Sequence, residues 1–338
     1  MTRRFPDAQR TKGAYIRRMP RIAVPSVALL WTLLGIVAVE IVVTYARLPA
    51  NELYHVSESG LRGGLSRALV FLDFPVALAA LPVIALAAER LRSSRVAVAA
   101  AIVGAVLCAV VAWPHVVDQA DLDAKPVNAL PALGVAIAFG LTLGARLLGE
   151  RARVNVLSVV LAGLLLVLAL PWLAAELGFS LGGVPVLGSV FLTGERVGSL
   201  AAVHHGHHHG MDGVLLALTA LALLPLASSM RAPTLRPATT VYLSLQLAYG
   251  LANAVQDAWS EQLVKRGTVH TEIPNVLHPE VTLAWLAVVL AAALFSLVAL
   301  RRRGVGDRST SGRTDGVEQS GLPRSERLRR LDGTWRGE

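Results

Sequence analysis

The residues best suited to chemistry in this 338-residue chain are its nine histidines, five of which lie within six consecutive positions. The block reads His-His-Gly-His-His-His from His204 to His209, and Asp212 follows it. On a helix, residues four apart lie on one face. A helix through this block would therefore place His204, His208 and Asp212 in one stripe and His205 with His209 in a second.

Two imidazoles at this spacing can bind one metal ion, and a nearby carboxylate can complete the ligand set or orient a ring. The pattern predicts a site for a divalent metal, zinc or copper, formed by His204, His205, His208, His209 and Asp212. Two other interpretations stay open. One is a histidine cluster that binds metal only adventitiously, and the other is a metal-free acid–base or pH-sensing role.

Carboxylates inside long apolar runs are a second signal. Asp73 lies within Phe-Leu-Asp-Phe-Pro, and Glu40 lies near the end of the first apolar run. Charged groups at membrane depth are costly and by default mark functional sites. We predict Asp73 as a catalytic candidate. A structural hydrogen bond is the alternative for Asp73, and the two roles are evenly balanced for Glu40.

A third signal is a polar stripe formed by Gln246, Tyr249, Asn253 and Gln256, at positions i, i+3, i+7 and i+10 of an apolar run. Such a stripe lines a cavity or hydrogen-bonds to neighbouring helices. Asp257 follows the stripe at the predicted membrane interface, and it is the second catalytic candidate.

The elements that must position these residues are long apolar segments. The chain is 54% hydrophobic and 16% charged, with a mean hydropathy of +0.55. Runs of about 18 or more apolar residues predict membrane-spanning helices. The expected fold is an all-α polytopic bundle of about eight spans. These are predicted at residues 23–45, 67–88, 96–113, 131–148, 154–174, 204–229, 238–258 and 281–300.

The basic residues predict the orientation of these spans. With the N-terminus in the cytoplasm, the cytoplasmic segments hold 25 of the 32 Lys and Arg residues, as the positive-inside rule requires. Both termini are then cytoplasmic, and the histidine block lies at the outer face. This distribution also explains the net charge of +9 without a nucleic-acid partner. The excess of Arg over Lys indicates a high-GC bacterial genome, and so a bacterial plasma membrane.

Three flanking segments complete the layout. Residues 1–22 form a basic cytoplasmic tail before the membrane domain at 23–300. Residues 301–338, rich in Gly, Ser, Arg and Asp, are predicted to be disordered. The outer segment 175–203 is apolar and glycine-rich, so we expect it to pack on the helix ends or to re-enter the membrane.

Three functions fit these signals. The first is a metal-dependent enzyme that activates water for attack on a lipid or envelope substrate. The second is a transporter or metal-handling protein, with Asp73 and the polar stripe on the path of the ion. The third is a scaffold or pH sensor. The chain has no Gly-x₄-Gly-Lys-Ser/Thr motif, which argues against a self-contained ATPase. Beyond the lipid bilayer and such a substrate, no partner or oligomeric state is predicted.

Overall fold

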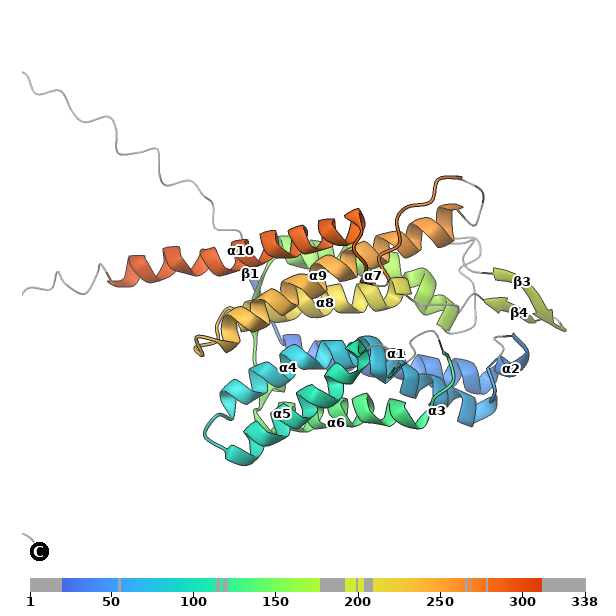
Figure 1. Ribbon diagram of the computed structural model, residues 1–338, viewed down its shortest axis with the longest axis horizontal. Coiled ribbons are helices and arrows are strands. Elements are labelled where there is room, and N and C mark those ends of the chain that lie inside the picture. Colours follow the sequence, from blue (N-terminus) through green and yellow to red (C-terminus); the bar gives the residue numbers. More distant parts are fainter. Residues whose placement is uncertain are drawn as a thin grey trace, which may run out of the picture.

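Long helices lying side by side make up the body of the protein (Figure 1). This computed structural model describes residues 20–53, 56–113, 116–117, 121–176, 192–198, 200–203, 209–264, 267, 269–277 and 279–311. The long helices are α1 (Ser26–Arg47), α3 (Gly60–Phe71), α4 (Ala77–Arg90), α5 (Arg95–Ala109), α6 (Ala129–Gly144), α7 (Val156–Glu176), α8 (His209–Ala227), α9 (Leu235–Trp259) and α10 (Leu283–Ser311). The shorter ones are α2 (Ala50–Leu53), η1 (Leu72–Val76), η2 (Val110–Ala112), η3 (Pro126–Asn128), η4 (Leu147–Gly149) and η5 (Ser260–Val264).

Six helical segments among the described residues are long and apolar enough to cross a membrane, which confirms the prediction of a multi-pass helical protein. Two other expected spans, 154–174 and 238–258, coincide with α7 and α9. The described apolar part of α7 is shorter, at Val156–Leu170, and α9 carries the polar stripe. The six segments are Ser26–Arg47, Gly60–Arg90, Arg95–Ala112, Pro126–Gly144, Gly210–Ala227 and Leu283–Arg301.

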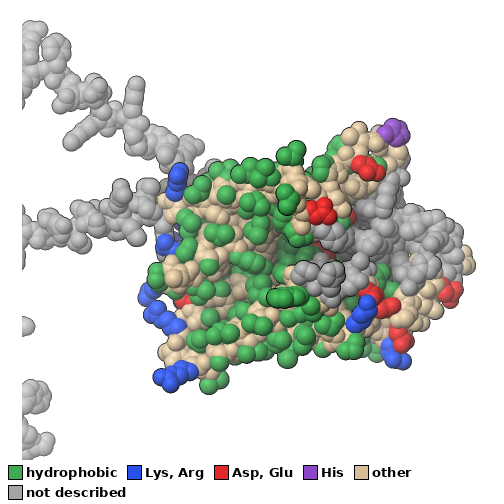
Figure 2. Space-filling view, viewed as in Figure 1, with side chains coloured by type: hydrophobic (Ala, Val, Ile, Leu, Met, Phe, Trp, Pro, Cys, Tyr) green, Lys and Arg blue, Asp and Glu red, His purple; other side chains and the backbone are tan. Residues whose placement is uncertain are grey.

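The helices differ sharply in how far the protein encloses them. In α8, 78% of the most apolar window is buried, whereas the corresponding share is 22% for α5 and 17% for α10. Hydrophobic side chains cover much of the face of the bundle seen in Figure 2, and many large apolar side chains are exposed. A helix that is apolar all round belongs either in a protein core or in lipid. We conclude that α8 is central and that α5 and α10 are peripheral.

Charge separates the two ends of the bundle. Lys and Arg side chains gather at one end of the visible face, and most Asp and Glu side chains lie at the other (Figure 2). We call the end that carries the α4–α5 turn the basic end, because Arg90, Arg92 and Arg95 flank that turn. The opposite, acidic end carries the residues that precede α3 and α6, including Glu58 and Asp121.

Two antiparallel ribbons, which the sequence did not predict, join segments distant in the chain. β1 (Arg21–Val24) pairs with β2 (Ala152–Asn155) just before α1 and α7, with Arg21 opposite Asn155. β3 (Leu192–Val197) pairs with β4 (Leu200–Val203), which gives a hairpin within the loop predicted at 175–203. The first ribbon satisfies backbone groups that short unpaired segments beside a membrane would leave without partners.

The described helices differ from the predicted bounds at two places, and a third bound is untested. The span expected at 67–88 is a broken helix, Gly60–Arg90, interrupted at η1. For the span expected at 204–229, the described helix begins at His209, and residues 204–208 lie outside the described part. The last helix continues to Ser311, beyond the expected end at 300, and residues 312–338 lie outside the described part.

The packing of α8 on α9 depends on two glycines. A Cβ atom built on Gly213 would lie 2.7 Å from the carbonyl oxygen of Gly250 and 2.8 Å from the backbone nitrogen of Ala254. Small residues allow such backbone approach between membrane helices. The seam between these helices is therefore too narrow for any larger residue at Gly213.

We expect Gly213→Ala to destabilise the protein by about 1–3 kcal/mol, the usual cost of overpacking. Gly140→Ala is the matched control, because nothing lies within 4 Å of a Cβ there and alanine favours a helix. Cys108 is the chain's single cysteine and is fully buried, so a thiol-reactive fluorophore reports unfolding during heating in detergent. Equal melting temperatures for the two variants would contradict this account of the seam.

Candidate functional site

The helix break at η1 positions the most deeply buried carboxylate. Phe74 has non-helical angles, φ −144° and ψ 116°, and precedes Pro75 through a cis peptide bond. Proline has no N–H, so it cannot donate the helical hydrogen bond to the carbonyl four residues earlier, that of Phe71. Irregular backbone at membrane depth occurs only where protein or a polar cavity surrounds it. Asp73 lies inside this break and is 1% exposed.

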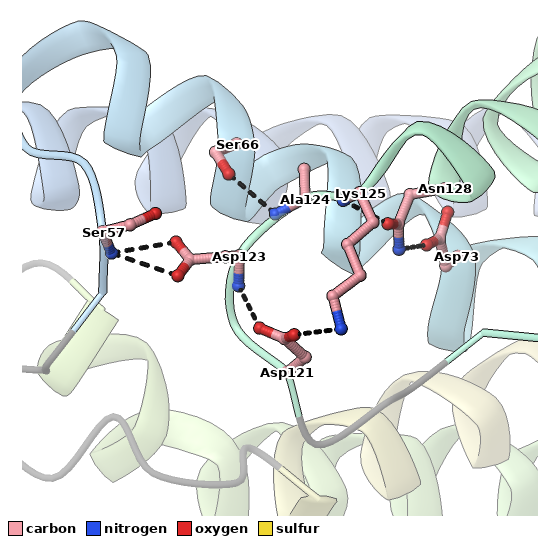
Figure 3. A network of polar contacts seen from close by, with 8 residues as sticks. All are labelled: Ser57, Ser66, Asp73, Asp121, Asp123, Ala124, Lys125 and Asn128. Carbon is pink, nitrogen blue, oxygen red and sulfur yellow. Dashed lines mark hydrogen bonds and ion pairs between the residues drawn. The ribbon is translucent and has the colours of Figure 1, made fainter. Parts of the chain in front are cut away.

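Asn128 is the hydrogen-bond partner of Asp73. Its Nδ2 donates to Asp73 Oδ2, and its own Oδ1 accepts from the backbone nitrogen of Lys125 at 2.6 Å (Figure 3). Asn128 is itself 3% exposed. Asp73 Oδ1 has no hydrogen-bond partner among the described residues. A buried carboxyl oxygen without a partner is costly, so Asp73 Oδ1 is the polar atom of the break that its described surroundings leave unsatisfied.

Two carboxylates, Asp121 and Asp123, hold the loop before α6. Asp121 Oδ2 pairs with Lys125 Nζ at 2.5 Å, and Asp121 Oδ1 accepts from the backbone nitrogen of Asp123 at 2.9 Å. The Lys125 ammonium, helped by the Asp123 amide, lowers the pKa of Asp121 below its usual value. These contacts fix the backbone that presents Asn128 to Asp73.

Further hydrogen bonds fasten this loop to the segment before α3 and to α3 itself. Both carboxylate oxygens of Asp123 accept from the backbone nitrogen of Ser57 at 3.1 Å. Ser66 Oγ on α3 accepts from the backbone nitrogen of Ala124 at 2.9 Å (Figure 3). These contacts join the loop before α3, the loop before α6 and α3 itself. We call the residues that make them the polar bracket: Ser57, Ser66, Asp121, Asp123, Lys125 and Asn128.

The other two aspartates lie on the α8–α9 pair at the acidic end. Asp212, next to Gly213 of the narrow seam, is 9% exposed and interacts electrostatically with the Tyr249 phenol. Asp257 lies near the end of α9 and is 8% exposed, so it is more enclosed than its predicted interfacial position suggested. Asp73 makes its side-chain hydrogen bond to Asn128, and the described contacts do not join it to Asp257.

Tyr249 and Gln256 of the polar stripe bond to a neighbouring segment, one of the two roles predicted for the stripe, whereas the buried Gln246 side chain has no hydrogen-bond partner among the described residues. The Tyr249 hydroxyl donates to the Leu277 carbonyl at 3.4 Å, and Gln256 Oε1 accepts from the Val276 nitrogen at 3.0 Å. The Tyr249 ring also stacks on Trp285 of α10, with centroids 5.6 Å apart. The stripe therefore fastens the loop before α10 to α9.

The predicted histidine ligands fall mostly beyond the described residues. His204, His205 and His208 lie outside them, and His209 is the first residue of α8, with no description of its side chain. Among the described residues, no three His, Cys, Asp or Glu side chains gather in a group that could hold a metal ion. The ligand set therefore stays a prediction, with Asp212 its described member.

Sequence reasoning missed Asn128 and the bracket around it. The signal was Lys125-Pro126-Val127-Asn128, where a proline begins a helix and an asparagine can bond backward. This signal does not predict the contact with Asp73, because that contact joins residues 55 positions apart in the chain.

Exchanging the two partners tests the Asp73–Asn128 contact. We expect Asn128→Asp to cost about 1–3 kcal/mol of stability, because it sets two acceptors against each other and removes a donor. The double variant Asp73→Asn/Asn128→Asp restores a donor–acceptor pair and should recover most of that loss. The measurement is the melting temperature reported by the Cys108 thiol. A double variant no more stable than Asn128→Asp would show that this contact does not hold the break.

Comparisons of this chain with protein-family models, with curated proteins and with solved structures give no match.

Proposed function

We propose that this multi-pass membrane protein binds a divalent metal ion, zinc or copper, at the acidic end of its bundle. The ligands are His204, His205, His208 and His209, with Asp212 as the carboxylate. The observation that carries the proposal is the buried position of Asp212, three residues after His209 at the start of α8. A histidine block joined to an enclosed carboxylate has the ligand types that zinc and copper prefer.

The proposal includes an orientation with eight crossings and both termini in the cytoplasm. The basic end faces the cytoplasm, as the positive-inside rule requires, and the metal site opens outward. Glu89 of α4 accepts hydrogen bonds from the backbone nitrogens of Arg231 and Ala232, in the turn between α8 and α9. This turn therefore lies at the basic end, beside the α4–α5 turn, as the proposed orientation requires. The bacterial plasma membrane is the proposed location.

Cysteine labelling tests this orientation. In a Cys108→Ala background, we expect Ser59→Cys to react with an impermeant maleimide on intact cells, because Ser59 is exposed at the acidic end. Ser93→Cys, exposed in the α4–α5 turn, should react only after the membrane is permeabilised. The reverse labelling pattern would overturn the orientation.

For a metal-dependent enzyme, the bound ion would supply an activated water for attack on a lipid or envelope substrate. Asp73 and Asp257 are its proposed acid–base residues, one inside the helix break and the other near the outer end of α9. Transport is the second candidate, and the helix break favours it. Discontinuous helices with a buried carboxylate are a recurrent feature of transporter binding sites.

Metal analysis of the untagged, detergent-purified protein tests the proposed ligands. We expect near-stoichiometric zinc or copper in the wild type and loss of that metal in His204→Ala/His208→Ala. Asp212→Asn should weaken binding by at least about tenfold, the effect of losing even an indirect partner of a ligand. His270→Ala is the control, because His270 is an exposed histidine on a loop. Equal metal content in all four proteins would refute the histidine site.

A further inference from the structure

Arg67 of α3 is the one Lys or Arg that is buried among the residues whose exposure is described, at 8% exposed. It lies in the middle of the buried face of α3, between Gly63 and Gly64 on one side and Val70 and Phe71 on the other. A charged group enclosed in a membrane protein is costly, so it is normally paired or marks a site for a substrate or an ion. Arg67 therefore needs an anionic partner.

The described part of the chain supplies no such partner. None of its ion pairs includes Arg67; they are Arg62–Glu58, Arg90–Glu150 and Lys125–Asp121. The Nε atom of Arg67 is buried and has no hydrogen-bond partner among the described residues. Asp73, the carboxylate of the same broken helix, bonds to Asn128 instead. The described side chains thus leave the charge of Arg67 uncompensated.

Backbone packing fixes the position of α3 around this arginine. A Cβ atom on Gly63 would collide with the carbonyl of Glu58, and one on Gly64 would collide with the carbonyl of Val42 on α1. A long side chain on a helix leans toward the N-terminus of that helix. We therefore expect the Arg67 guanidinium to lie toward the acidic end, where α1 and the segment before α3 close on this helix.

The depth of Arg67 suits a phosphate group. Arg67 lies 23 residues before Arg90, where the broken helix ends at the basic end. At ~1.5 Å per residue this separation is about 34 Å along the helix, whereas the hydrocarbon core of a bilayer is about 30 Å thick. The guanidinium is thus at the level of the lipid headgroups of the acidic end. A guanidinium can donate two parallel hydrogen bonds to the oxygens of one phosphate.

We propose that Arg67 binds the phosphate group of a ligand at the acidic end of the bundle. A phospholipid of the adjacent leaflet and a water-soluble phosphate compound both present the required oxygens. The site uses neither the histidine block nor Asp212, so it does not depend on the proposed metal site. A bound phosphate would compensate the buried charge and would stabilise the folded protein by mass action.

Calorimetric titration of the full-length, delipidated protein in a phosphate-free detergent tests this site. The probes are inorganic phosphate and dihexanoyl phosphatidylglycerol, and dihexanoylglycerol is the lipid control without phosphate. We expect one phosphate group to bind per chain and binding to be at least about tenfold weaker in Arg67→Met. Arg67→Lys keeps the charge but not the paired donors, so its affinity should lie between the two. Arg62→Gln, which changes an exposed arginine of the same helix, should bind like the wild type.

The two probes distinguish the sources of the phosphate. Binding of phosphatidylglycerol alone, dependent on Arg67, would identify a lipid headgroup, and binding of inorganic phosphate would show that free phosphate is sufficient. His204→Ala/His208→Ala should bind the probes like the wild type, even where it has lost zinc or copper. If the wild type binds neither probe, or if folded Arg67→Met binds them equally well, the proposal is wrong.

Melting temperatures, reported by the Cys108 thiol, separate ligand binding from a structural role of Arg67. Without a probe, Arg67→Met should melt at or above the wild-type temperature, because it removes a buried charge that lacks a partner. Phosphatidylglycerol or inorganic phosphate, whichever binds, should raise the melting temperature of the wild type and leave that of Arg67→Met unchanged. A lower melting temperature of probe-free Arg67→Met would show that Arg67 bonds within the protein, and would overturn the proposal.

Discussion

A hydrocarbon environment offers no hydrogen bonds, so a membrane protein must satisfy its own backbone and carboxyl groups. The break at η1 depends most on this constraint, because it combines irregular backbone with the buried Asp73. Asn128 supplies one hydrogen bond, and the loop before α6 supplies the geometry that makes it possible. The second oxygen of Asp73 has no hydrogen-bond partner among the described residues. The arrangement of α3, α4 and α6 around η1 follows from this need.

The same constraint explains the narrow seam between α8 and α9. In lipid, apolar side chains gain little by leaving one environment for another, so close backbone packing and polar contacts hold helices together. Gly213 and Gly250 permit the approach, and polar residues lie beside them along the seam. Asn253 is fully buried there, and its Cβ touches the position that a side chain on Gly213 would fill. This packing gives α8 its enclosed position and keeps Asp212 away from lipid.

Different kinds of contact stabilise the two ends of the bundle. At the basic end, the β1–β2 ribbon and the Glu89 contacts fasten the starts and turns of helices to one another. At the acidic end, the polar bracket and the contacts of the α9 stripe fasten loops to helix ends. Contacts between segments that are distant in the chain therefore hold both ends of the bundle.

The sequence by itself determined the helical class, the approximate spans and the separation of charge, because apolar length and Arg placement are local properties of the chain. It also identified Asp73 and the α9 stripe as polar groups that need partners. Tertiary structure alone decided which partners they have. The contact of Asp73 with Asn128, the crossing of Gly213 on Gly250 and the pairing of Arg21 with Asn155 each join distant positions. Periodicity within one helix carries no information about such contacts, because they depend on how separate helices pack.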